Sequence, residues 1–189
     1  MQSDVDAVST AIINILVVVD TANVKATLPA PSQDPAAPTP VDQENLFILG
    51  SGARGNIAGQ CSANLQFSAN AGDYVSISGT SIYHNSDDAV VVYSLEYTAG
   101  EMAFNAFSPS FLTRSYAVTP DPEVETGIPP GHTSIDFSSL ESRTKGHGME
   151  KLSICFGLYT LAKDGETQEL FGYYCSRPSL TVSVPLLAG

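Results

Sequence analysis

Apolar and polar residues alternate in several short runs of this chain, and one run follows the pattern most clearly. Every second position there is apolar, with serine, asparagine or glutamine between: Cys61, Ala63, Leu65 and Phe67. A period of two predicts a β-strand with one buried face. A turn over residues 71–73 follows, and Val75 and Ile77 then continue the same pattern into a second strand. The centre of the chain is therefore predicted to be a meander of half-buried strands.

The run Ile12–Val19 is apolar apart from Asn14, which favours a buried central strand with its odd-numbered face toward the core. Residues 134–145 form the one segment with the character of a short helix, and a Ser-Pro-Ser turn is predicted at 108–110. The polar stretch 85–88 suits a corner, because Asn and Asp tolerate turn conformations. Further strands are predicted over residues 46–49, 89–97, 102–107, 111–118, 149–162, 170–175 and 180–187.

Two long loops interrupt these strands. Residues 26–45 contain five prolines, and residues 119–131 form a second proline-rich loop that is also acidic. Short strands with regular turns and no amphipathic helix predict an all-β fold. We expect one domain, residues 1–189, built as an antiparallel β-sandwich of Greek-key or jelly-roll-like type. The residues expected in its core are Ile13, Ile15, Val17, Leu65, Phe67, Val75, Ile77, Val91 and Leu158.

Composition limits the possible functions. The chain has 189 residues and 43% hydrophobic residues, which suits a globular domain, and no apolar run is long enough for a membrane span. The formal net charge of −12, with only eight Lys and Arg residues, disfavours nucleic acid as a partner. The excess of carboxylates is explained either by solubility or by a cation site that some of them line.

The N-terminal run does not resemble a secretion signal, since Asp4 and Asp6 stand where positive charge is needed. The chain is therefore expected to be cytoplasmic. Three cysteines, Cys61, Cys155 and Cys175, form neither a disulfide framework nor a zinc pattern, so three free thiols are expected.

Four segments, in this order, resemble the PixA/AidA family of bacterial inclusion-body proteins. They are Val19-Asp20-Thr21 after the first strand, NLFILGSG at 45–52, ANLQFSANAGDYVSI at 63–77 followed by HNSDDAVVVY at 84–93, and FGYYCSRPSLTV at 171–182. The chain departs from the family pattern in having Ile77 where an aromatic residue is usual and Ser176-Arg177-Pro178 in place of a closing Trp-Asp-Pro. Its three methionines also make methionine storage a poor description of this member.

The resemblance implies a β-sandwich that accumulates in cytoplasmic inclusions of host-associated bacteria, with expression tied to quorum sensing or growth phase. It supplies no catalytic residues and no cofactor, and none is predicted from the residues themselves. We therefore expect a non-enzymatic, self-assembling protein, most simply a homo-oligomer joined through an edge strand or a sheet face. The alternative is a β-sandwich module that binds a carbohydrate, a lipid or a small ligand, and this binding either requires Ca²⁺ or does not.

The candidate site residues are few. Asn85, Asp87 and Asp88 supply oxygen atoms of the kind that Ca²⁺ prefers, although a turn that caps a strand explains them as well. Asp20 is a candidate for lining a ligand pocket or for capping loop amides. Tyr93 is a candidate ligand-binding residue within a set of tyrosines that offers either a sugar-stacking face or ordinary packing: Tyr93, Tyr97, Tyr159, Tyr173 and Tyr174.

Overall fold

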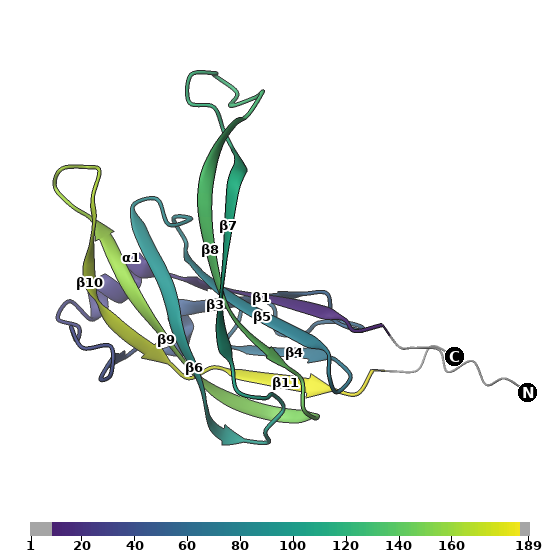
Figure 1. Cartoon of the computed structure of the whole chain (residues 1–189). Helices are drawn as coiled ribbons and strands as arrows, with labels where there is room; N and C mark the ends of the chain where they lie inside the picture. The colour runs from purple at the N-terminus through teal and green to yellow at the C-terminus, as the bar shows by residue number, and fades with distance from the viewer. Residues whose placement is uncertain (1–8, 186–189) are drawn as a thin grey trace, which may run out of the picture.

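The computed structural model describes residues 9–185, and two β-sheets packed face to face make up most of it (Figure 1). Sheet A has five strands, in the spatial order β3 (Leu46–Ser51), β1 (Ile12–Val19), β5 (Tyr74–Ser81), β8 (Gly131–Arg143) and β7 (Ser108–Thr119). Sheet B is organised around the long strand β9 (Gly148–Leu161). Its other strands are β2 (Thr39–Pro40), β10 (Gln168–Ser176), β11 (Ser179–Ser183), β4 (Asn64–Ser68) and β6 (Asp88–Gly100).

The predicted sandwich is confirmed, but its sheets are mixed rather than wholly antiparallel. Strand β1 runs parallel to β5, β11 runs parallel to β4, and β2 runs parallel to β10. Each of these pairs joins strands that lie far apart in the sequence, whereas hairpin neighbours such as β9 and β10 are antiparallel. Turn residues in the sequence predict hairpins, which join antiparallel neighbours. Parallel pairs arise from long crossover connections, and no local sequence pattern predicts which strands these connections bring together.

The core lies between the two sheets. The odd-numbered face of β1 is buried as predicted, and Leu65, Phe67, Val75, Ile77 and Leu158 are buried as well. The prediction that Val91 lies in the core is wrong, because this residue is 45% exposed. It lies opposite Gly157 on the outer face of sheet B, while its neighbours Val90 and Val92 point inward. Three consecutive valines do not reveal which of them faces the core.

Three other local predictions are wrong. Residues 134–145 lie largely in strand β8 rather than in a helix. Residues 102–107 form no regular strand, and of these Phe104 makes an isolated bridge with Thr144. The Ser-Pro-Ser segment belongs to β7, where Pro109 is tolerated because β7 is an edge strand.

The regular helix forms where none was expected. Helix α1 (Thr21–Thr27) begins directly after β1, and the 3₁₀ turn η1 (Gln43–Asn45) ends the first proline-rich loop. The Asp20 carboxylate caps α1 by accepting a hydrogen bond from the Asn23 amide at 3.1 Å. Cys61 was expected to face inward and is exposed instead, because β4 begins only at Asn64.

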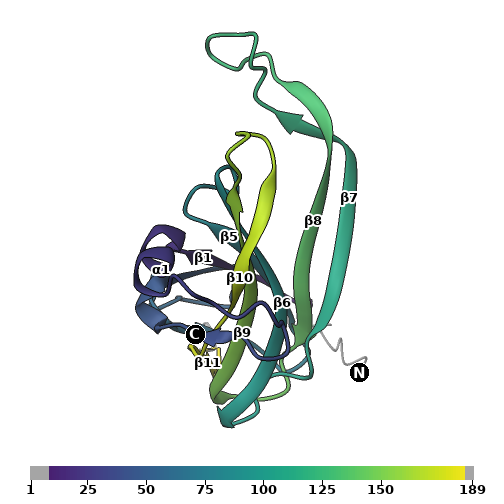
Figure 2. The same cartoon turned by 90° about the vertical axis from the view of Figure 1, so that its left-hand side faces the viewer.

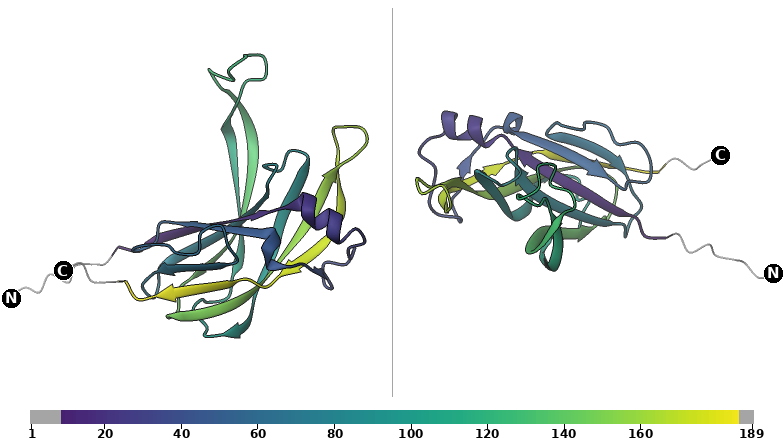
Figure 3. Two further views of the ribbon diagram at one scale, coloured as in Figure 1. Left: turned by 180° about the vertical axis from the view of Figure 1, so that it is seen from behind. Right: turned by 90° about the horizontal axis from the view of Figure 1, so that it is seen from above.

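The first proline-rich loop lies along β10, as the view from behind shows (Figure 3). Tyr174 anchors it there: its ring is fully buried against Phe156, and its hydroxyl donates to the Leu28 carbonyl at 2.9 Å. Burial raises the pKa of Tyr174 to about 12, so the hydroxyl stays a donor at any physiological pH. At the other end of the chain, β11 ends at Ser183, and the last two residues of the strand predicted over 180–187 lie outside the described residues.

The β7–β8 hairpin is far longer than the sheet that it belongs to. Figures 1 and 2 show it rising beyond the rest of the molecule, with the acidic 119–131 loop at its tip. Its base is held to the sandwich through β5, which pairs with residues Leu140 to Arg143 of β8. We call residues 110–139, the part of the hairpin beyond the Pro109–Leu140 pair, the arm.

Candidate functional site

Tyr93 lies at the centre of a cleft on the outer face of sheet B. Its ring and the ring of Tyr173 are nearly perpendicular, in an edge-to-face arrangement with 5.7 Å between the ring centroids. Its hydroxyl donates to the Pro35 carbonyl at 2.8 Å, so the first proline-rich loop closes one side of the cleft. Residues from β6, β10 and the loop therefore come together at one place.

Gly157 forms the floor of the cleft, between the rings of Tyr159 and Tyr173. A Cβ atom there would lie 3.2 Å from the Tyr159 ring and 3.4 Å from the Tyr173 ring, so a larger residue would displace them. The hollow above it has a volume of about 300 Å³ and is lined by Pro35, Val91, Tyr93, Gly157, Tyr159 and Tyr173. Its walls are almost entirely aromatic and aliphatic, which suits the apolar face of a ligand.

The cleft continues into a more polar groove of about 510 Å³ that shares Pro35 and Tyr93 with it. This groove runs between the proline-rich loop and β6, and Glu96 and Arg177 are the charged residues that line it. Aromatic walls beside a few polar groups are an arrangement that binds sugars or prolines by stacking and hydrogen bonds. We call the two hollows together the Tyr93 cleft.

Burial raises the pKa of Tyr93, and the nearby Tyr173 and Asp34 raise it further. Its phenol therefore stays protonated near neutral pH and acts as a hydrogen-bond donor rather than as a base. The sequence picked out Tyr93 among several tyrosines, and the structure shows that Tyr159 and Tyr173 share its surroundings. By contrast, Tyr174 lies in the core.

The three candidate cation ligands do not converge. The Asn85 side-chain oxygen accepts hydrogen bonds from the Ser81 amide at 2.8 Å and from the Val90 amide at 3.0 Å, which clamps the turn between β5 and β6. Asp87 is exposed, and Asp88 is buried. Cation binding at this turn stays a prediction, and the geometry matches the alternative interpretation of a turn that caps a strand.

Asp88 instead pairs with a cation from the protein itself. The Lys25 ammonium of α1 donates to the Asp88 carboxylate at 2.6 Å, and the Thr160 hydroxyl donates to it at 2.9 Å. Burial raises the pKa of Asp88, but the hydrogen bonds and the positive charge of Lys25 outweigh burial and hold the pKa below its usual range. This ion pair fastens α1 to sheet B.

Asp20 lies at the start of α1, and its carboxylate caps that helix as described above. The structure therefore places its side chain in the helix cap rather than beside Tyr93. The spacing Asp20-Thr21-Ala22-Asn23 carries the signal for this role, since Asp is a favoured N-cap residue.

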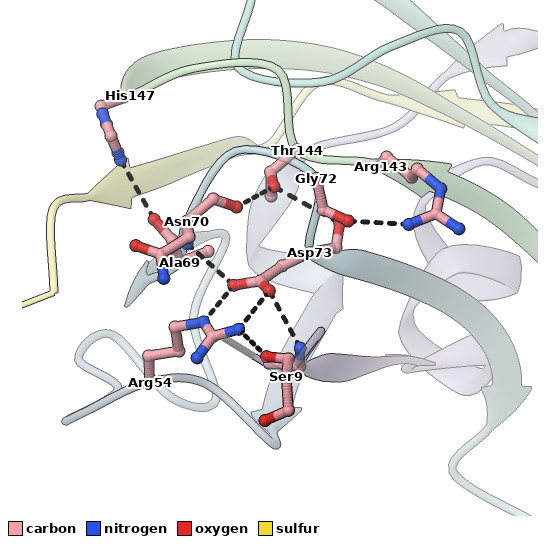
Figure 4. A network of polar contacts seen from close by, with 10 residues as sticks. Ser9, Arg54, Ala69, Asn70, Gly72, Asp73, Arg143, Thr144 and His147 are labelled. Atoms are coloured by element: carbon pink, nitrogen blue, oxygen red, sulfur yellow. Dashed lines mark hydrogen bonds and ion pairs between the residues drawn. The ribbon is translucent and has the colours of Figure 1, made fainter. Parts of the chain in front are cut away.

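The most connected buried carboxylate is one that sequence reasoning missed. Asp73 is 2% exposed and holds the Arg54 guanidinium through two hydrogen bonds, of 2.5 Å and 2.7 Å (Figure 4). Its oxygens also accept from the amides of Ala11 at 2.9 Å and Asn70 at 2.8 Å. The carboxylate thereby joins the start of β1, the loop after β3 and the turn before β5.

The rest of this network joins backbone carbonyls of the 69–73 turn to groups at and after the end of β8. The Thr144 amide donates to the Asp73 carbonyl at 2.9 Å, and the Arg143 guanidinium donates to the Gly72 carbonyl at 2.8 Å. His147 lies 3.0 Å from the Ala69 carbonyl (Figure 4). These contacts tie the 69–73 turn to residues at and just after the end of β8, so the network helps to organise the fold.

The expectation of three free thiols is wrong. Cys155 of β9 and Cys175 of β10 are joined by a disulfide, and their Cα atoms are 4.1 Å apart. The two residues lie directly opposite one another in the antiparallel pair. The bridge lines the groove of the Tyr93 cleft, and the Ser153 hydroxyl lies 2.8 Å from the Cys175 sulfur. Cys61 is a free cysteine.

Among residues 9–185, no group of three or more His, Cys, Asp and Glu side chains is placed to hold a metal ion. None of the helices in that part of the chain is long and apolar enough to cross a membrane.

Comparisons with known proteins give one consistent result. The family model of the PixA inclusion body proteins matches residues 11–182. A crystal structure of an inclusion body protein of this family from Burkholderia cenocepacia is similar to the chain, with a TM-score of 0.74 and 29% sequence identity. The similarity covers 93% of this chain and 97% of that one. A search of curated proteins found no match.

Proposed function

Because the chain belongs to the PixA family of inclusion body proteins, we propose that it is a non-enzymatic protein that accumulates in the cytoplasm of a host-associated bacterium by self-assembly. The observation that carries this proposal is the family match, which extends over residues 11–182. The structure adds support, because the polar clusters at Asp73 and Asp88 are occupied by partners within the fold. Control of expression by quorum sensing or growth phase is part of the same proposal.

Self-assembly must overcome the charge of the chain. A formal net charge of −12 repels like molecules, and the sequence pI is near 4.3. We therefore expect light scattering to increase as NaCl screens the charge and as the pH falls from 7 toward 5. Circular dichroism at each pH must show that the protein is still folded. A strictly monomeric protein at high concentration under all these conditions contradicts the proposal.

Calcium chloride separates the two explanations of the acidity. If the carboxylates at residues 87 and 88 or in the 119–131 loop bind cations, CaCl₂ should promote assembly at concentrations where NaCl of equal ionic strength does not. Equal effects of the two salts identify screening as the cause. Asp87→Asn provides the matched variant, since Asp87 is exposed.

The Tyr93 cleft favours a second candidate function, the binding of a glycan or another small ligand with an apolar face. Tyr93→Ala is expected to abolish any hit from a glycan array, because it removes both the stacking surface and the hydrogen bond to Pro35. Tyr97→Ala is the matched control, since Tyr97 is an exposed tyrosine of the same strand that does not line the aromatic hollow. An array with no hits leaves assembly as the function.

The compartment can be tested separately. Cytoplasmic thiols are normally kept reduced, so the Cys155–Cys175 bridge favours an oxidising compartment, whereas the family favours the cytoplasm. Fractionation of growing cells decides between them. Recovery of the protein with periplasmic or secreted markers contradicts the cytoplasmic proposal.

A further inference from the structure

A further hollow lies beside strand β6. Within the described residues this strand pairs with β9 alone, and the base of the β7–β8 hairpin lies close to it (Figure 2). The hollow has a volume of about 390 Å³, within the usual range for small-molecule sites. We call it the Glu150 pocket, and the residues that form its inner walls and rim include Leu95, Tyr97, Phe104, Phe107, Leu140 and Glu150.

The walls of the Glu150 pocket lead from the surface into the core. Met102 and Tyr97 line it and are 53% and 45% exposed. Leu95, Phe104 and Leu140 also line it, and all three are buried core residues. Such a passage removes the apolar body of a small molecule from water, which favours binding.

Glu150 occupies a position in β9 where the alternation of the strand calls for an apolar side chain. It is 3% exposed and lies on the same face as the buried Leu152 and Ile154. Burying a carboxylate is costly unless it is paired and hydrogen-bonded. One of its oxygens, Oε2, accepts from the amides of Ala103 at 2.6 Å and Phe104 at 3.0 Å. These two bonds hold the segment after β6, but they account for that oxygen alone.

The second oxygen, Oε1, is available to a ligand. It makes no hydrogen bond to residues 9–185, and it is not one of the unpaired polar side-chain atoms that are sealed from solvent there. It is therefore reached through the pocket that Glu150 lines. The ion pairs of the described residues are Lys25–Asp88 and Arg54–Asp73, so no lysine or arginine among them neutralises Glu150 by direct contact.

The charges that line the pocket are all negative. They belong to Glu150 and to the exposed Glu96, and none of the lining residues is basic. Burial raises the pKa of Glu150, and the amides of Phe104 and Ala103 together with the charge of Lys145 offset this effect only in part. Glu150 therefore retains an uncompensated cost of burial, which a cation beside Oε1 would relieve.

An organic cation fits this lining better than a metal ion does. Two carboxylates fall short of the about six to eight oxygen ligands that Ca²⁺ takes. Within residues 9–185 no three His, Cys, Asp or Glu side chains are grouped to hold a metal. An ammonium group, by contrast, donates charge-assisted hydrogen bonds to a carboxylate, and nearby aromatic rings add cation–π attraction.

From these observations we propose that the Glu150 pocket binds a primary amine with an apolar body. The ammonium group donates to Oε1 of Glu150, and the body lies against Phe104, Phe107 and Leu140. The site lies within one chain, so the inference goes beyond the proposed self-assembly and does not depend on it. Tyr93, Ser94 and Glu96 line both this pocket and the Tyr93 cleft, so the experiment must tell the two sites apart.

Titration of the whole chain, followed in ¹H–¹⁵N NMR spectra, tests the proposal with 2-phenylethylammonium as the probe. The neutral 2-phenylethanol has the same body and should bind at least about 10-fold more weakly, because it carries no charge to pair with the carboxylate. The anion 3-phenylpropanoate should bind more weakly still. The amide signals of Ala103 and Phe104 should shift with the amine, since both amides donate to Glu150.

Three variants locate the site. Glu150→Gln should weaken amine binding by about 10-fold or more and leave binding of the alcohol nearly unchanged. Glu96→Gln is the matched control, since Glu96 is an exposed glutamate that lines the same pocket, and it should keep most of the affinity. Tyr159→Ala alters the Tyr93 cleft without touching a residue of the Glu150 pocket, so it should bind the amine as the wild type does. Urea unfolding verifies that each variant is folded.

Several outcomes overturn the proposal. Equal affinity of the wild type for amine and alcohol does so, as does amine binding that Glu150→Gln leaves unchanged. Loss of binding in Tyr159→Ala assigns the amine to the Tyr93 cleft instead. Lys145→Gln removes a nearby positive charge and should not weaken amine binding, so a loss equal to that in Glu150→Gln contradicts the charge pairing. If Glu150→Gln does not fold, the comparison of amine with alcohol in the wild type and the shifts at Ala103 and Phe104 decide.

Discussion

Replacing Asp73 with asparagine is expected to lower the free energy of unfolding by about 3 kcal/mol. Removing one partner of a buried ion pair costs about 3–5 kcal/mol, because the other charge is left without compensation. Asp73 is almost fully buried, whereas the Arg54 side chain is 20% exposed and regains some hydration, which favours the lower end of that range. Urea unfolding at pH 7 measures the effect.

The same variant should lose part of the acid sensitivity of the protein. Burial raises the pKa of Asp73, but the Arg54 guanidinium and two backbone amides outweigh burial and lower it below its usual range. A carboxyl with a lowered pKa in the folded state stabilises the fold fully above its unfolded pKa of about 3.9. That contribution is lost as the pH falls through the folded value, so the difference between wild type and Asp73→Asn should shrink toward acid pH.

Asp87→Asn is the matched control for Asp73→Asn, because it makes the same change at an exposed carboxylate. Its free energy of unfolding should stay within about 0.5 kcal/mol of the wild type. If Asp73→Asn is as stable as this control, then the network in Figure 4 contributes little to the fold.

Sequence reasoning succeeded where one local pattern determines the outcome. The alternation around Leu65 and Phe67 and the placement of Asn14 identified which faces are buried, because burial of one face imposes a period of two. The turn between β9 and β10 contains Asp164 and Gly165, residue types that suit a hairpin turn. The Asp164 carboxylate accepts from the Glu166 and Thr167 amides, and the hydrogen bonds there lower its pKa to about 2.

Sequence reasoning failed where distant segments determine the structure. Asp73 is an ordinary turn residue in the sequence, and its role follows from Arg54, Ala11 and the end of β8, which only the folded chain brings together. The arm could not be predicted either. The strands around residues 111–118 show apolar residues, but whether a second sheet covers them depends on how far sheet B extends.

The Tyr93 cleft lies between these two cases. Tyr93 was identified as a candidate because aromatic residues often line binding sites. Its partners could not be assigned, since the floor is a glycine and one wall comes from the proline-rich loop. The sequence predicts a loop there but not the face of the sheet on which it lies.

The pairing of Cys155 with Cys175 depends on one extra residue in strand β10. The register between β9 and β10 shifts by one residue at the bulge between Leu170 and Gly172. Without the bulge, Cys155 would lie opposite Tyr174, and Cys175 would lie opposite Ile154 of the buried face. With it, both cysteines reach the outer face and form a bridge, which a count of three cysteines could not show.

Removing this bridge is expected to have the second large effect on stability. Cys155→Ser with Cys175→Ser should lower the free energy of unfolding by about 2–3 kcal/mol, because the bridge closes a loop of 20 residues and so restricts the unfolded chain. Urea unfolding with and without dithiothreitol measures it. The reductant should bring the wild type to the stability of the double variant and leave the double variant unchanged.

Cys61→Ser is the control for the bridge, since Cys61 is an exposed free thiol. It should match the wild type within about 0.5 kcal/mol and should respond to dithiothreitol as the wild type does. If dithiothreitol does not change the free energy of unfolding of the wild type, the stabilisation assigned to the bridge is contradicted. Cys155 and Cys175 also line the groove of the Tyr93 cleft. A ligand that contacts the bridge should therefore bind the double cysteine variant more weakly. Tyr93→Ala should weaken binding whether the bridge is oxidised or reduced.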